Sequence, residues 1–172
     1  MKENIAQVIR GGGIGVLPTD TLYGLVGSAM NAKTVERIYR VRKRNPKKPM
    51  IILIGSERDL ETFGVKPTGE QRKLLKKIWP GPVSVIFPCA ARRFRYLSRG
   101  IGTLAFRLPA KPALRRLLKQ TGPIVAPSAN PEGREPAETI QKARRYFGGA
   151  VDCYSDGGML RGIPSTVIEM RR

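Results

Sequence analysis

Short apolar segments alternate with longer amphipathic segments along the chain, and this alternation restricts the fold more than any other feature of the sequence. Apolar segments of strand length occupy residues 14–17, 50–54, 83–87, 103–108, 124–126, 151–155 and 165–170. Helical patterns cover residues 3–10, 31–40, 68–79, 111–122 and 137–148. Strands that alternate with helices indicate an α/β protein with a mixed, partly parallel sheet flanked by helices.

Local signals mark where the helices begin. Thr68 with Gln71 forms a capping-box pattern, and Ser56 with Asp59 forms a similar one. The glycine-rich residues 11–15 follow a helix and precede a strand, which is the wrong order for a phosphate-binding loop. We therefore expect them to form a helix-ending turn.

The composition excludes several classes of protein. A length of 172 residues with no linker or repeat predicts a single domain over residues 1–172. We see no secretion signal and no apolar run of about 18 residues, so we expect a cytoplasmic protein without a membrane segment. The chain has no histidine and two distant cysteines, Cys89 and Cys153. Serine–histidine triads, histidine metal sites and cysteine-rich zinc modules are therefore excluded, and we expect no metal-ligating residues.

The charge is strongly positive and unevenly distributed. Lys and Arg number 32 against 13 Asp and Glu, a net charge of +19. Residues 71–131 hold thirteen basic residues and no acidic one, and residues 37–48 hold seven more basic residues, again with no acidic one. Such a field attracts nucleic acid or nucleotide phosphates, although solvated helix faces that only keep the protein soluble remain an alternative.

Two polar segments adjoin predicted strands. PTDTLYGL, residues 18–25, is expected to be a loop at a strand end, where the Thr19 and Thr21 hydroxyls could bind a ligand. The alternative is a turn satisfied by its own side chains. VRKRNPKKPM, residues 41–50, could grip a triphosphate, with Arg44 as a planar fork and Lys43 or Lys48 as point charges. A solvated basic turn is the alternative there.

Arg107 lies in an otherwise apolar strand with no acid nearby in sequence. A buried cation needs an anionic partner, so Arg107 is a candidate for holding a ligand carboxylate. A core pair with Asp20 or Asp156 is the structural alternative. Ser128 and Asn130 follow another strand and suit either a ligand or a turn.

The candidate side chains are hydroxyls, amides and cations without a nucleophile–base pair. Such a set suits group transfer at phosphorus, where catalysis is mostly positioning and neutralisation of charge. Its members are Thr21, the cations of residues 42–48, Arg107, Ser128, Asn130 and Ser165.

Seven motifs then occur in a familiar order: PTDTLYGL, RKRNPKKPM, WPGPVSVIF, TLAFRLP, APSAN, DGG and GIPSTV. Together they resemble the YrdC-like family of threonylcarbamoyl-AMP synthases, from about residue 5 to residue 169. The resemblance implies the short, single-domain form, with a twisted mixed α/β sheet and a basic concave face. It also implies a nucleotidyltransferase that condenses L-threonine, bicarbonate and ATP to threonylcarbamoyl-AMP and pyrophosphate, with Mg²⁺ assisting.

The resemblance further implies partners. The product would pass to transfer-complex proteins that modify tRNA, and members of the family also bind tRNA or double-stranded RNA. A relative that binds RNA without catalysing synthesis is therefore the alternative function.

The resemblance assigns roles to individual residues, among which Arg44 and Arg107 would be catalytic. The residues implied for ATP are Arg42, Arg44, Lys48, Thr103, Ser128 and Asn130, and those implied for threonine are Thr21, Arg107, Ala126 and Ser165. The sequence departs from the family pattern at Arg42, where a lysine is usual, and at Leu53, where many members have a histidine. Arg171 and Arg172 stand where longer members continue toward a segment that contacts ATP.

Overall fold

The computed structural model describes residues 4–170, so Glu3 of the expected first helix, Arg171 and Arg172 lie outside the described residues. The helices are α1 (Ile5–Arg10), α2 (Ala32–Arg42), α3 (Asp59–Thr62), α4 (Gly69–Ile78), α5 (Arg95–Ser98), α6 (Pro112–Thr121) and α7 (Ile140–Phe147), with short 3-10 turns η1 (Arg92–Phe94) and η2 (Gly148–Ala150). The strands are β1 (Ile14–Pro18), β2 (Tyr23–Ser28), β3 (Ile52–Leu53), β4 (Val83–Pro88), β5 (Thr103–Arg107), β6 (Ile124–Val125), β7 (Cys153–Tyr154) and β8 (Thr166–Glu169).

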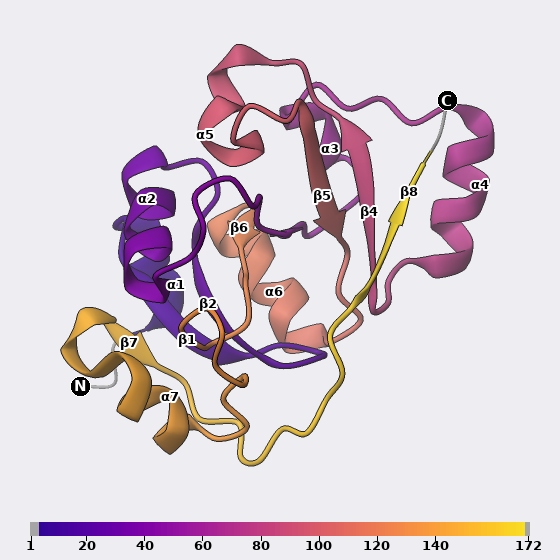
Figure 1. Cartoon of the computed structure of the whole chain (residues 1–172). Coiled ribbons are helices and arrows are strands. Elements are labelled where there is room, and N and C mark those ends of the chain that lie inside the picture. Colours follow the sequence, from indigo (N-terminus) through magenta and orange to yellow (C-terminus); the bar gives the residue numbers. More distant parts are fainter. Residues whose placement is uncertain (1–3, 171–172) are drawn as a thin grey trace.

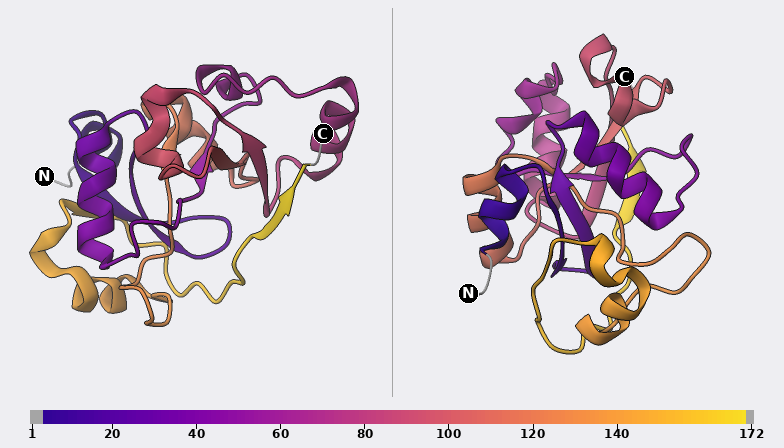
Figure 2. Two further views of the ribbon diagram at one scale, coloured as in Figure 1. Left: turned by 45° about the horizontal axis from the view of Figure 1, so that its top comes forward. Right: turned by 90° about the vertical axis from the view of Figure 1, so that its left-hand side faces the viewer.

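All of these strands join one mixed sheet in the order β7-β1-β2-β6-β3-β5-β4-β8. The pairs β1–β7, β3–β5 and β4–β8 are parallel, and the other neighbours are antiparallel. The predicted α/β class with a partly parallel sheet is therefore confirmed. Figures 1 and 2 show β7 with α7 at one edge of the sheet and β8 beside β4 at the other.

The strand β2 was not predicted, because its sequence YGLVGS contains two glycines that indicate a turn. The reading of residues 18–25 as a loop is wrong in part, since they form the end of β1, a hairpin turn and the start of β2. Gly27 shows why a glycine is needed inside this strand. A Cβ at Gly27 would lie 2.5 Å from the Thr34 side chain, so the missing side chain lets α2 pack directly against the sheet.

The two central strands of the sheet, β3 and β6, have only two residues each, as does the edge strand β7. The expected strand over residues 50–54 is reduced to Ile52–Leu53 in β3, and β6 is equally short. Single hydrogen bonds extend the pairing, with Ala126 N donating to Ile51 O and Ile54 N donating to Arg107 O. Short central strands leave the chain segments beyond their ends free to line a cavity.

Most helix boundaries follow the capping signals of the sequence. The Asn31 side chain accepts from two backbone N–H groups of α2, and the Thr68–Gln71 capping box opens α4. The Ser56–Asp59 pattern does not form the expected box. There the Ser56 hydroxyl donates to the Asp59 carboxylate, which also accepts from Ser56 N, and α3 has only four residues.

Two apolar cores hold the sheet between its helices. The smaller core packs α1 and α6 against the sheet through residues such as Ile9, Leu118 and Ile124. The larger core joins α2, α4, α5 and α7 to the sheet, with Phe63 and Phe106 among its fully buried side chains. Within residues 4–170, no helix has the length and apolar character needed to cross a membrane.

Candidate functional site

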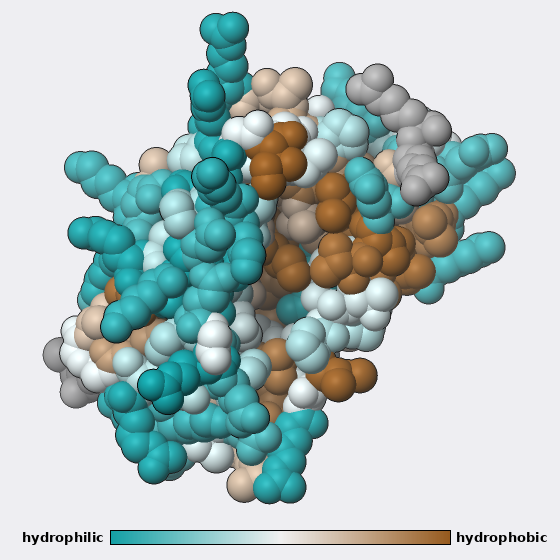
Figure 3. Space-filling model, in the orientation of Figure 1, coloured by the Kyte–Doolittle hydropathy of each residue, from teal (hydrophilic) through white to brown (hydrophobic). Residues whose placement is uncertain are grey.

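A cavity of about 540 Å³ opens beside the short central strands. Eight of the ten residues that the family resemblance implies for ATP or threonine line it: Thr21, Arg42, Arg44, Thr103, Arg107, Ala126, Ser128 and Ser165. Figure 3 shows a hollow between a hydrophilic side and an apolar wall. Exposed Ile101 and Val167 contribute to the apolar lining. Residues from distant parts of the chain thus meet in one place.

The β1–β2 hairpin turn forms one end of the cavity. The Thr19 hydroxyl donates to Leu22 O at 2.6 Å and accepts from Thr21 N and Leu22 N, so Thr19 satisfies the turn itself. The alternative of a self-satisfied turn is therefore confirmed for Thr19. Thr21 lines the cavity, with its hydroxyl 3.1 Å from the hydroxyl of Thr19 and 3.4 Å from Nη1 of Arg107.

Arg107 has an acidic partner in the hairpin turn. Its Nη1 donates to Asp20 Oδ1 at 2.7 Å, and both side chains are almost fully buried. Asp20, and not Asp156, is the partner that the sequence left open. Burial lowers the pKa of Arg107 and the neighbouring Asp20 carboxylate opposes that shift. The Nε atom of Arg107 is buried without a hydrogen-bond partner within residues 4–170.

Arg42 at the end of α2 also lines the cavity and has a different environment. Its Nε donates to Asn130 O at 2.8 Å, and its Nη2 donates to Ser128 Oγ and Asn130 Oδ1 at 3.3 Å each. These acceptors are neutral, and no carboxylate within the described residues forms an ion pair with Arg42. Burial lowers the pKa of Arg42 to about 10, which leaves the side chain charged at neutral pH. Its Nη1 has no partner among the described residues.

The cation loop, residues 42–48, begins at Arg42. Arg44 folds back on this loop, since its Nε donates to Lys48 O and its Nη2 donates to Pro49 O. Lys43 caps α2 in the left-handed conformation, with φ 50°, and is exposed. The loop therefore presents Arg44 to the cavity and the lysines to solvent.

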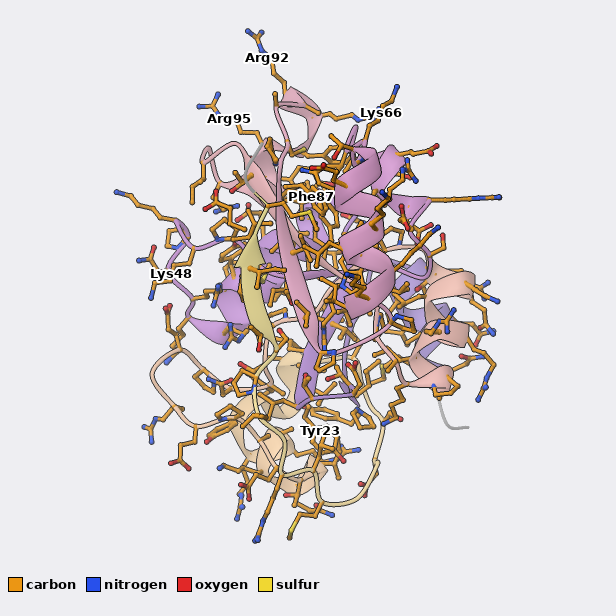
Figure 4. All side chains as sticks on the ribbon, turned by 90° about the vertical axis from the view of Figure 1, so that its right-hand side faces the viewer. Tyr23, Lys48, Lys66, Phe87, Arg92 and Arg95 are labelled. Atoms are coloured by element: carbon orange, nitrogen blue, oxygen red, sulfur yellow. The ribbon has the colours of Figure 1, made fainter. Side chains whose placement is uncertain are left out.

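Lys48 and Asn130 do not line the cavity. Lys48 is exposed, lies at the outer edge of the molecule in Figure 4, and donates to Glu132 Oε1 at 2.9 Å. Asn130 is buried, and its Nδ2 donates to Pro131 O and Arg134 O. The side chain of Asn130 is thus fully engaged in holding its own loop and Arg42.

The segment of residues 157–165 closes the site over the hairpin. The buried Tyr23 hydroxyl donates to Gly158 O at 2.7 Å, which ties this segment to β2. A Cβ at Gly162 would lie 1.7 Å from Thr21 O, so the segment passes directly against the hairpin turn. Beyond it, the Ser165 hydroxyl lies 2.9 Å from that of Ser84 and lines the cavity.

A comparison with family models matches residues 7–172 to the Sua5/YciO/YrdC model, whose description is telomere recombination. The chain belongs to the Sua5/YciO/YrdC family. Among curated relatives, a threonylcarbamoyl-AMP synthase of Pyrococcus abyssi is 35% identical over 167 residues, which are 96% of this chain and 49% of the relative. A threonylcarbamoyl-AMP synthase of Halorhodospira halophila is 32% identical over 156 residues, which are 90% of this chain and 82% of the relative.

Solved structures of the Sua5/YciO/YrdC family share the fold. P. abyssi Sua5 complexed with L-threonine superimposes with a TM-score of 0.90 at 34% identity, over 96% of this chain and 49% of that one. E. coli YciO superimposes with a TM-score of 0.85 at 25% identity, over 98% and 82%. The chain therefore spans about half the length of the Pyrococcus protein and most of the length of YciO.

The two positions that the resemblance marks as departures from the family pattern lie in different settings. Arg42, at the usual lysine position, lines the cavity. Leu53, at the usual histidine position, is fully buried in the smaller core and does not reach the cavity. Met50 and Ile51, which directly precede β3, line the cavity instead.

The possible metal-ligating side chains of this Sua5/YciO/YrdC domain do not cluster into a metal site within the described residues. Within the described residues, no group of three His, Cys, Asp or Glu side chains could hold a metal ion. Asp20 in the hairpin turn and Glu132 beside the cation loop are engaged by Arg107 and Lys48, respectively. Within residues 4–170, these side chains therefore do not form a resident Mg²⁺ site.

Sequence reasoning missed three contributors to the site. Lys111 Nζ donates to Pro18 O and Thr19 O and so braces the hairpin, and Gly162 permits the close approach of the covering segment. Glu132 pairs with the cation loop. A signal for Glu132 was present in the sequence, since it is the first acid after the long acid-free stretch of residues 71–131.

Proposed function

We propose that this chain is a threonylcarbamoyl-AMP synthase, a nucleotidyltransferase that condenses L-threonine, bicarbonate and ATP to threonylcarbamoyl-AMP and pyrophosphate. The observation that carries the proposal is one cavity whose lining includes two buried arginines, Arg42 and Arg107. The names of the relatives support the same activity. A relative solved with L-threonine supports the substrate.

Threonine would occupy the hairpin end. Arg107 would bind the substrate carboxylate through donors that Asp20 does not use, and Asp20 would hold the guanidinium in place. Thr21 and Ser165 would contact the polar groups of the substrate, and Ala126 would limit the space beside it. Because Arg107 and Asp20 together are neutral, this end suits an amino acid, which carries one positive and one negative charge.

ATP would occupy the other end. Arg42 and Arg44 would hold the phosphates, with Ser128 and Thr103 beside them. Lys48 would approach from the rim, and Asn130 would act on the nucleotide through Arg42. Within the described residues, neither Arg42 nor Arg44 forms an ion pair with a carboxylate, so this end keeps an attraction for a polyanion.

The reaction balances in two steps. The threonine amine attacks the carbon of bicarbonate and forms a carbamate with release of water. A carbamate oxygen then attacks the α-phosphorus of ATP, the bond from that phosphorus to the bridging oxygen breaks, and pyrophosphate leaves with the bond's electron pair. Arg42 and Arg44 stabilise the negative charge that develops on the leaving group. Mg²⁺ would enter as part of the substrate, bound to the phosphates of ATP.

The test is release of pyrophosphate from ATP with threonine and bicarbonate present together. Release should fall to background when either is omitted. Release that is the same without threonine would contradict the proposal. Serine and valine as replacement amino acids would define how the hairpin end selects its substrate.

RNA binding is a second candidate, favoured by exposed cations on one end of the molecule. Arg92, Arg93 and Arg95 are exposed on η1 and α5, and Figure 4 shows Arg92 and Arg95 extending into solvent. The candidate requires that binding of structured RNA weaken steeply with salt, by about 0.7–0.9 in log K per phosphate contact. A flat salt response would exclude it.

The proposed synthase would work with further partners. Its product is a mixed anhydride that must pass to proteins which transfer the threonylcarbamoyl group to tRNA. The exposed cations on η1 and α5 would meet tRNA or an acidic partner of that kind. The reaction would take place in the cytoplasm, together with ATP, tRNA and these partners.

A further inference from the structure

Glu132 reaches the cation loop from the segment that follows β6. Its carboxylate accepts a short hydrogen bond from Asn45 N and another from Lys48 Nζ at 2.9 Å. Its backbone N–H donates to Arg42 O at 2.8 Å. One residue therefore contacts the first, middle and last parts of the cation loop.

The charge of Glu132 is isolated within this neighbourhood. Among the described residues, it is the one acid in an ion pair with the cation loop, since Arg42, Lys43, Arg44 and Lys47 form none. The hydrogen bond from Asn45 N, followed by that from Lys48, lowers the pKa of Glu132. The carboxylate is therefore ionised at neutral pH and occupies the position of an anion bound to the loop.

We propose that Glu132 is an internal counter-ion that competes with the phosphates of the substrate for Lys48, while its bond to Asn45 maintains the shape of the cation loop. This inference rests on the proposed function in that it concerns the same phosphate end of the cavity. It assigns Glu132 a positioning role that limits affinity for ATP and eases release of pyrophosphate.

The two roles of Glu132 can be separated by substitution. Glu132→Gln keeps an oxygen that can accept from Asn45 N but removes the negative charge. We expect this variant to bind ATP and inorganic tripolyphosphate about two- to fivefold more tightly, the range that exposed ion pairs allow. Glu132→Ala also removes the acceptor, so it should bind both probes more weakly than Glu132→Gln.

The measurement is calorimetric titration of the whole chain with ATP and with tripolyphosphate at low and high salt. The gain in Glu132→Gln should shrink at high salt, because screening weakens exposed charges. A matched control exists in Glu57→Gln. Glu57 accepts from Arg72 at 2.8 Å and its side chain is 28% exposed, as is that of Glu132. It lies outside the cavity lining and its substitution changes the net charge equally, so affinity should not change.

A double-mutant cycle tests the competition for Lys48 directly. In a Lys48→Gln background, Glu132→Gln should give little further gain in affinity. A gain of the same size in that background would overturn the competition. Equal effects of Glu132→Gln and Glu57→Gln would also overturn it, because net charge alone would then explain the result.

These outcomes are distinct from failure of the proposed function. Binding of ATP and tripolyphosphate is measured without threonine or bicarbonate, so it does not depend on synthesis. If pyrophosphate release proved independent of threonine, the synthase proposal would fail while the affinities still decided the role of Glu132. Unchanged affinity in Glu132→Gln, with intact synthesis, would overturn only the inference about Glu132.

Discussion

The two buried arginines of the cavity differ in what surrounds them. Arg42 and Arg107 are each 3% exposed, and burial lowers the pKa of both. Arg107 has a carboxylate partner, Asp20, at 2.7 Å. Arg42 is held by a carbonyl oxygen, an amide oxygen and a hydroxyl, all of them neutral.

This difference explains how one cavity could seat two unlike substrates. The Arg107–Asp20 pair is neutral overall and directional, which suits one carboxylate of an amino acid. Arg42 forms no ion pair within the described residues and lies in a place of low dielectric, where its attraction for phosphate is strong. The arginine without a carboxylate in direct contact is the one we assign to the polyanion.

The largest effect is expected from Asp20→Asn. This substitution removes the carboxylate beside Arg107, which is then left, like Arg42, without an ion pair. A buried charge that loses its partner costs about 3–5 kcal/mol of unfolding free energy. The midpoint of urea unfolding should fall accordingly. Asp156→Asn, at the exposed aspartate that does not pair with Arg107, is the control and should change stability by less than about 1 kcal/mol. Equal midpoints for the two variants would contradict the account.

A smaller effect, confined to the threonine end, is expected from Gly162→Ala. The added Cβ would overlap Thr21 O, so the covering segment must move away from the hairpin and carry Ser165 with it. Threonine affinity should fall by about tenfold, equivalent to about 1.4 kcal/mol, while ATP affinity stays the same. The control is Gly149→Ala, where a Cβ meets nothing within 4 Å. Parallel loss of both ligands in Gly162→Ala would show that the two ends are not independent.

The smallest effect is expected from Arg42→Lys, which restores the usual family residue. A lysine keeps the charge but not the planar fork that reaches Asn130 and Ser128 together. ATP affinity should change by about threefold or less, within about 0.7 kcal/mol, and threonine affinity should not change. A loss of more than about a hundredfold in titrations with ATP would show that the fork, and not the charge, holds the phosphates.

The sequence predicted the fold where local signals and periodicity agree. The capping box at Thr68, the cap at Asn31 and the apolar strands β4 and β5 were all anticipated. The strand β2 was not, because its Gly27 serves the packing of α2 and not a turn. Helix α5 was also missed, since its four residues are too few to show a period.

The sequence predicted which residues belong to the candidate site better than it predicted what those residues contact. Thr21, Arg107 and Ser165 were chosen from separate strand ends, and the fold brings them to one cavity. The sequence left open whether Arg107 pairs with Asp20, because the two are 87 positions apart. Contacts such as Glu132 with Lys48 depend on how two loops from different strands meet, which no local pattern records.

The most direct test of the account is a crossed titration of Arg42→Met and Arg107→Met with ATP and with threonine. Arg42→Met should lose at least about tenfold in ATP affinity and retain threonine binding, and Arg107→Met should do the reverse, with circular dichroism confirming that each variant is folded. Loss of both ligands to the same extent in both variants, or loss of threonine alone in Arg42→Met, would contradict the assignment of the two ends.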